Sequence, residues 1–105
     1  MNFRLVLAAA PEDRNSSEQL SAVLLRIGNA AMSEGRYEMA ADSYSELVKL
    51  DGGNADLHNN FGTILAKLGN LKGAMDQFEA ALKANPGHPS ARRNLEQIRS
   101  KLAPR

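Results

Sequence analysis

The sequence predicts an all-α fold: a right-handed antiparallel helix-hairpin solenoid of two repeats and a C-terminal capping helix. The main observation is an internal repeat, because residues 55–88 match residues 21–54 at an offset of 34. A period of this length is typical of stacked helix pairs. The identical pairs are Gly28 and Gly62, Gly35 and Gly69, Ala40 and Ala74, Asp42 and Asp76, Lys49 and Lys83, and Gly53 and Gly87. Composition agrees with helices, since Ala and Leu are common and aromatic residues make up only 5% of the 105 residues.

Two helix-start signals precede the first repeat. Pro11 and the two acids after it suit the first turn of a helix. Ser16, with Gln19 three residues later, fits a capping box. We favour the start at Ser16, which leaves residues 1–15 as a flexible or weakly ordered N-terminal arm and residues 16–105 as the repeat domain.

The first ten residues superficially resemble a secretory signal. Their apolar part, Leu5 to Ala10, is shorter than the roughly 7–15 residues of a signal core. Pro11 would also follow the cleavage point, which is unfavourable. We therefore favour a cytoplasmic protein over a secreted one, although the absence of cysteine leaves the redox compartment open.

The first repeat, 21–54, divides into two helices at Gly35, a residue type that commonly follows a helix end. The apolar residues expected to be buried on the first helix recur at helical spacing: Leu20, Val23, Leu24, Ile27, Ala30 and Ala31. The second helix is expected over about 37–50. Its buried face is Tyr37, Ala40, Ala41, Tyr44, Leu47 and Val48.

The second repeat, 55–88, and the capping helix, 89–102, follow the same logic. Asn54 and Asn70 can cap helices over about 55–68 and 71–84, and Pro89 suits the first position of the last helix. The face expected to be buried on the fourth helix is Leu71, Ala74, Met75, Phe78, Ala81 and Leu82. On the last helix it is Leu95, Ile98 and Leu102.

Gly28 and Gly62 lie in the middle of helices, where glycine costs about 1 kcal/mol relative to alanine. Both make sense if a neighbouring helix crosses too closely for a Cβ atom. The residues expected opposite them are the small Ala40 and Ala74 and, one turn on, the large Tyr44 and Phe78. We therefore predict antiparallel helix hairpins packed at these glycines.

At these residues the chain resembles the tetratricopeptide repeat family. The residues that match its pattern in the second repeat are Phe61, Gly62, Leu65, Ala74, Phe78, Ala81 and Pro86. Those that match in the first repeat are Ile27, Gly28, Ala31, Ala40 and Tyr44. The chain departs from the pattern where Leu24 and His58 replace a bulky aromatic residue and where Gly52 replaces a proline. The resemblance covers about residues 21–102.

The resemblance implies a non-catalytic protein-interaction adaptor or scaffold, which binds a peptide or partner segment in a groove lined by the first helix of each pair. The implied groove residues are Leu25, Arg26, Asn29, Met32 and Ser33, then Asn59, Asn60, Thr63 and Lys67, and finally Arg93, Asn94, Gln97 and Lys101. This surface is rich in amides and mildly basic. Amides both donate and accept hydrogen bonds, so they suit the backbone of an extended peptide.

One subclass of the family grips the C-terminal carboxylate of heat-shock chaperones through two asparagines and three cations. Asn29 and Asn60 match the asparagines. Leu25, Ser90 and Asn94 stand at the cationic positions, and Arg93 is adjacent but at the wrong helical angle. Without those cations the main attraction for a carboxylate is missing, so we do not expect this clamp.

No residue pattern indicates catalysis, and we expect neither a cofactor nor a metal ion. The histidines, His58 and His88, are thirty residues apart and are expected to be a packed and a surface histidine. No nucleophile–base pair, paired-acid motif or phosphate-binding glycine loop is present. We expect Tyr37 and Tyr44 to be core residues rather than residues that stack on a substrate.

Charge is distributed unevenly although the net charge is only +1. Residues 12–51 hold eight acids and four Lys or Arg, a net of −4, whereas residues 88–105 hold five Lys or Arg and one acid, a net of +4. The two ends of different copies could therefore meet, which makes a self-assembling dimer or extended solenoid one alternative. A second is binding of nucleic acid or an anionic membrane by the basic last helix, but no interleaved aromatic residues support it.

Overall fold

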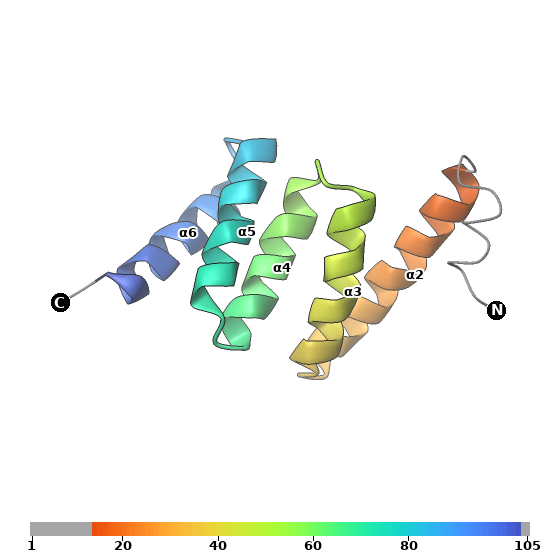
Figure 1. Ribbon diagram of the computed structural model, residues 1–105, viewed down its shortest axis with the longest axis horizontal. Helices are drawn as coiled ribbons and strands as arrows, with labels where there is room; N and C mark the ends of the chain where they lie inside the picture. The colour runs from red at the N-terminus through yellow and green to blue at the C-terminus, as the bar shows by residue number, and fades with distance from the viewer. Residues whose placement is uncertain (1–13, 104–105) are drawn as a thin grey trace.

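The computed structural model describes residues 14–103, which form five helices and no strand. The helices are α2 (Arg14–Ser33), α3 (Tyr37–Leu50), α4 (Ala55–Lys67), α5 (Leu71–Ala84) and α6 (Pro89–Leu102). Figure 1 shows them side by side in a row, with α2 at one end and α6 at the other. The result is an elongated molecule, with extents of 53 × 29 × 18 Å. The predicted all-α solenoid of two helix pairs and a last helix is confirmed.

Each repeat has its own apolar core, and α4 joins the two. The buried residues of the first core are Ala31, Ala40, Tyr44, Leu47, Leu57 and Ile64. Those of the second are Ala74, Phe78, Leu95 and Ile98. The apolar faces predicted for α3 and α5 point into these cores, as their spacing requires.

The two mid-helix glycines are sites of close approach, as predicted. A Cβ atom on Gly62 would lie 2.6 Å from Cε1 of Phe78, and one on Gly28 would lie 2.8 Å from Cε2 of Tyr44. Both distances are far shorter than a normal carbon–carbon contact. The buried ring on the second helix of each pair therefore packs directly against the backbone of the first helix, and only glycine leaves room for it.

Glycine and asparagine set the helix ends. Gly35 and Gly69 adopt φ values of +75° and +85°, the left-handed conformation that glycine tolerates best. The amides of Gly35 and Arg36 donate to the carbonyls of Met32 and Ala31, which is a Schellman motif. The predicted caps are confirmed, because Asn54 accepts from the amide of Leu57 and Asn70 from that of Gly73.

Four of the sequence-based expectations for these helices are wrong. Helix α2 already includes Arg14, so Ser16 lies inside it and is not its cap. Serine costs little in a helix, and Arg14 and Asn15 do not interrupt it. The expected arm, 1–15, lies almost wholly outside the described residues, so it remains a prediction.

The other three errors concern burial at the ends of the row. Ile27 is 41% exposed, Leu102 is 44% exposed and Ala30 is also exposed, although all three were expected to be buried. Among the described helices, the main partner of α2 is α3, so the face of α2 that carries Ile27 is left uncovered. Leu102 is the last residue of α6, beyond the reach of α5.

Candidate peptide groove

A buried tyrosine links the first helices of the two repeats. The hydroxyl of Tyr44, on α3, donates to Oδ1 of Asn29 on α2 at 2.5 Å, and it also hydrogen-bonds the side chain of Asn60 on α4. Tyr44 itself is fully buried, as predicted for a core residue. Two of the amides expected in the groove are thus positioned by hydrogen bonds to the same buried hydroxyl group.

The surroundings of Tyr44 favour its neutral form. Burial raises the pKa of the Tyr44 hydroxyl above its usual value, and the hydrogen bond from Asn60 opposes part of that rise. The group therefore stays protonated at neutral pH, and it can donate to Asn29.

A second polar link joins α4 to α6. Nδ2 of Asn94 donates to Oδ1 of Asn59 at 3.0 Å. The hydroxyl of Thr63 donates to the backbone carbonyl of Asn59 at 3.1 Å. Asn59 is only 9% exposed, so its side chain lies beneath the surface and positions Asn94.

A cleft of about 230 Å³ opens between α4 and α6, above the second core. Its lining combines an apolar floor with polar and basic walls. The lining residues are Thr63, Ala66, Lys67, Phe78, Asn94, Gln97, Ile98 and Lys101. Neither Lys67 nor Lys101 forms an ion pair with the described residues. The cleft is therefore basic, with no acidic group in its lining.

The structure brings together five of the predicted groove residues around this cleft. They are Thr63, Lys67, Asn94, Gln97 and Lys101. Arg93 lines a more open neighbouring hollow with Glu96, Gln97, Ser100 and Lys101. On α2, Leu25, Arg26 and Asn29 are exposed, whereas Met32 is half-buried and packs against the first core.

Sequence reasoning missed the floor of the cleft and the hydrogen bonds of Tyr44. The floor residues Phe78 and Ile98 were expected in the core, which is correct, but their outer edges also line the cleft. The role of the Tyr44 hydroxyl had a signal in the sequence, because the equivalent residue of the second repeat is Phe78. A hydroxyl present in one repeat and absent in the next indicates a local polar partner.

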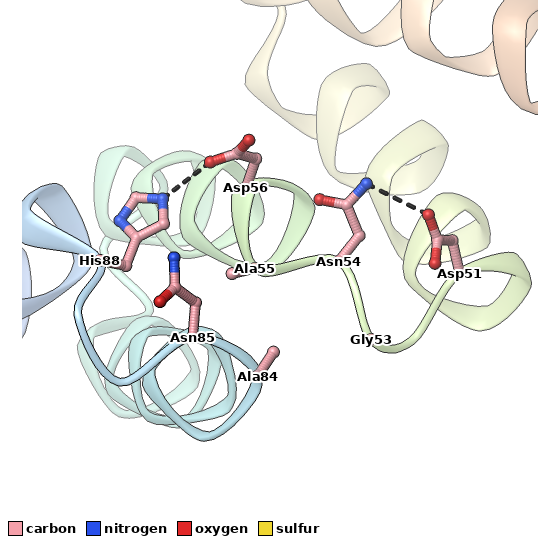
Figure 2. Close-up of a pocket in the computed structure, with 8 residues that line it drawn as sticks. All are labelled: Asp51, Gly53, Asn54, Ala55, Asp56, Ala84, Asn85 and His88. Carbon is pink, nitrogen blue, oxygen red and sulfur yellow. Dashed lines mark hydrogen bonds and ion pairs between the residues drawn. The ribbon is translucent and has the colours of Figure 1, made fainter.

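A larger, open hollow of about 420 Å³ lies where the two inter-repeat turns face each other (Figure 2). His88, from the turn before α6, points at Asp56 of α4, with 2.7 Å between Nε2 and Oδ1. Its Nδ1 accepts from the amide of Ala91 at 3.1 Å, so His88 is the N-cap of α6. The side chain is only 11% exposed. The expectation of a surface histidine is therefore wrong, and the polar contacts of this hollow stabilise the turns.

The other histidine also has a packing role. His58 is half-buried, and its ring nitrogens lie 2.8 Å from Oε1 of Gln77 and 2.8 Å from the carbonyl oxygen of Gly52. Over residues 14–103, no group of three His, Cys, Asp or Glu side chains could hold a metal ion. The same part of the chain contains no helix with the length and apolar character that a membrane crossing requires.

Comparison with known proteins identifies relatives built from the same repeat. The photosystem I assembly protein Ycf3 of Rippkaea orientalis is 30% identical over 97 residues, which cover 90% of this chain and 55% of the relative. The co-chaperone DNJ1 of Cryptococcus neoformans, which has a tetratricopeptide repeat and a J domain, is 30% identical over 81 residues. Those residues are 77% of this chain and 16% of the co-chaperone. The chain spans about half the length of the Ycf3 relative.

Solved structures of tetratricopeptide domains have the same fold. The first such domain of RPAP3, bound to an HSP90 peptide, superposes with a TM-score of 0.76 at 25% identity, over 80% of this chain and 67% of that one. The TPR2B domain of yeast Sti1, in complex with an Hsp70 peptide, gives 0.76 at 18% identity over the same shares. The family model for the tetratricopeptide repeat matches residues 25–97, well over half of the sequence. The chain belongs to the tetratricopeptide repeat family.

Proposed function

We propose that this chain is a non-catalytic interaction module that binds an extended peptide or partner segment along α2, α4 and α6. The observation that carries the proposal is the row of amide side chains whose orientation is fixed by hydrogen bonds to buried side chains. Asn29 and Asn60 are fixed by the buried hydroxyl of Tyr44, and Asn94 is fixed by Asn59. Amides with fixed orientation offer donors and acceptors to a peptide backbone without a further loss of side-chain entropy.

The comparisons support this class of function. Two of the similar solved structures hold chaperone peptides, and the curated relatives include a photosystem I assembly protein and a co-chaperone. For this chain we propose a ligand other than the chaperone tails. Leu25, Ser90 and Asn94 stand where the chaperone-binding subclass has cations, so the expected carboxylate clamp would lack its charges.

The proposal can be tested by selecting binders from a random peptide library on the immobilised chain. The selected peptide is then titrated into ¹⁵N-labelled protein and followed by NMR. We expect the shifted amide signals to lie on the exposed faces of α2, α4 and α6. Shifts confined to α3 and α5 would contradict the groove, and a library that yields no binder would contradict peptide binding itself.

Self-association is a second candidate, favoured by the exposed face of α2. Ile27 is 41% exposed, whereas its equivalent in the second repeat, Phe61, packs against the first core. A second copy could cover this face, and the opposite charges of residues 12–51 and 88–105 would favour the contact. Light scattering at two concentrations decides the matter. We expect an Ile27→Lys change, but not a change of the equally exposed Leu68 to Lys, to reduce the measured mass, and a wild-type monomer at both concentrations would eliminate this candidate.

Binding of nucleic acid or an anionic membrane through α6 is the weakest alternative. The basic residues Arg92, Arg93 and Arg99 are exposed, but Arg99 already pairs with Glu79 at 3.5 Å. Phosphate binding depends strongly on salt. Peptide affinity that persists from low to high salt, together with no detectable binding to a duplex DNA probe or to anionic lipid vesicles, would exclude this alternative.

A further inference from the structure

The two repeats differ at the place where the cleft opens between α4 and α6. Each residue of the cleft has an equivalent 34 positions earlier, at the junction of α2 and α4. Five pairs differ: Asn29 and Thr63, Met32 and Ala66, Ser33 and Lys67, Tyr44 and Phe78, and Thr63 and Gln97. Met32 to Ala66 and Tyr44 to Phe78 make the side chain smaller, Ser33 to Lys67 adds a cation, and Thr63 to Gln97 adds an amide.

The smaller residues explain why there is space in the second repeat. At the first junction the hydroxyl of Tyr44 hydrogen-bonds the side chains of both Asn29 and Asn60. At the second junction Phe78 has no hydroxyl group, and Thr63 turns its proton back to the carbonyl of its own helix. Ala66 also leaves the volume that Met32 fills in the first repeat. Asn94 bonds across this junction to Asn59, whereas Lys67, Gln97 and Lys101 face the cleft.

The groups that face the cleft are mainly donors. Lys67 and Lys101 contribute two ammonium groups that have no ion pair among the described residues. Gln97 is exposed, with its whole amide available, and Asn94 uses only one of its two N–H bonds, toward Asn59. Two cations and two amide donors, with no acid in the lining, are complementary to a carboxylate.

We propose that this cleft is a carboxylate-binding subsite that receives an acidic group of the bound peptide. The proposal rests on the peptide-binding function above and specifies its ligand. The carboxylate would lie between Lys67 and Lys101, with Gln97 and Asn94 donating to its oxygens. The aliphatic part of the acidic residue would lie over Phe78. The carboxylate belongs either to an Asp or Glu side chain or to a peptide C-terminus.

Three capped or uncapped pentapeptides distinguish these sources in an NMR titration of the intact chain. The first has a central glutamate and blocked ends, the second has glutamine in its place, and the third is the glutamine peptide with a free C-terminus. We expect the first or the third to shift the side-chain amide signals of Asn94 and Gln97, and whichever does so identifies the source. Equal shifts with the blocked glutamine peptide would overturn the proposal.

Matched variants test the cations and the space separately. The double change Lys67→Ala and Lys101→Ala should weaken binding of the carboxylate peptide about tenfold, since it removes both exposed cations of the cleft. Lys72→Ala with Lys83→Ala removes the same charge from α5, outside the cleft, and should change the affinity less than twofold. Ala66→Met should also weaken binding, because it places the first-repeat residue in the cleft.

An equal loss in both lysine double variants would overturn the subsite, because it would indicate net charge alone. The outcome is separable from that of the proposed function. A library-selected peptide that shifts signals on α2 but leaves Asn94 and Gln97 unchanged would reject the subsite and leave peptide binding intact.

Discussion

Replacing Gly62 by alanine should destabilise the protein, although alanine is the better helix former. The added methyl carbon would lie 2.6, 2.8 and 3.0 Å from Cε1, Cδ1 and Cζ of Phe78. Phe78 is 2% exposed and forms part of the second core, so its ring cannot move out into solvent.

Two opposing effects determine how much Gly62→Ala changes the free energy of unfolding. Overpacking of a well-packed core costs about 1–3 kcal/mol, whereas alanine gains about 1 kcal/mol over glycine within a helix. We therefore expect Gly62→Ala to lower the free energy of unfolding by about 1 kcal/mol. For a domain of this size such a loss lowers Tm by about 4–8 °C.

Urea denaturation followed by circular dichroism measures the change, and a double-mutant cycle with Phe78→Leu isolates its cause. If the ring is what the methyl group meets, Gly62→Ala should be neutral or stabilising once Phe78 is leucine. A Gly62→Ala protein that is about 1 kcal/mol more stable than wild type in the presence of Phe78 would refute the close-approach argument.

Three further changes test the polar contacts. Tyr44→Phe should lower stability by about 1 kcal/mol at pH 7 by removing the hydrogen bonds to Asn29 and Asn60, as measured by urea denaturation. Burial raises the pKa of Tyr44, so the stability that its hydroxyl contributes should be complete below the unfolded-state pKa of about 10. That stability should be lost as pH rises through the higher folded-state pKa. The free energies of unfolding of the variant and the wild type should therefore converge in strongly alkaline solution. A gap that widens there would contradict the assignment. Asn70→Ala should cost about 1 kcal/mol of stability through loss of the α5 cap, with the exposed Lys72 of α5 changed to Ala as the reference. His88→Ala should destabilise α6 by a similar amount in hydrogen exchange, and His88→Asn should restore most of it if capping, rather than the contact with Asp56, is the main contribution.

The repeat period predicted most of the fold, because each repeat carries the same glycines at the same helix crossing and the same helix end. Gly28 and Gly62 predicted the close helix crossings, and Gly35, Gly69, Asn54 and Asn70 predicted helix ends that the structure confirms. These features depend on the local backbone and on pairs of residues at fixed spacing. They can therefore be read from one sequence.

Burial at the ends of the row could not be predicted in the same way. Ile27 has the spacing of a core residue, but its burial requires a helix on the far side of α2. His88 looked like a turn residue, because its role depends on the distance to Asp56, thirty-two positions earlier. Both depend on which elements meet in space.

The sequence predicted where the residues of the candidate groove lie, but not which of their side chains are exposed. Thr63, Lys67, Asn94, Gln97 and Lys101 line one cleft, as expected of residues on neighbouring first helices. Asn59 was expected at the surface and is buried, since a hydrogen bond to Asn94 draws it under α6. The register of a repeat gives the face of a helix, whereas hydrogen bonds between helices decide which amides remain available.

The most direct test of the groove is site-specific photo-crosslinking with a peptide selected from the library. A photoreactive phenylalanine analogue is placed at Thr63, in the cleft between α4 and α6, or at the exposed Asp76 of α5. Mass spectrometry then measures the fraction of peptide attached to each protein. Peptide binding in the groove predicts attachment at position 63 and little at position 76. The reverse result would contradict the account.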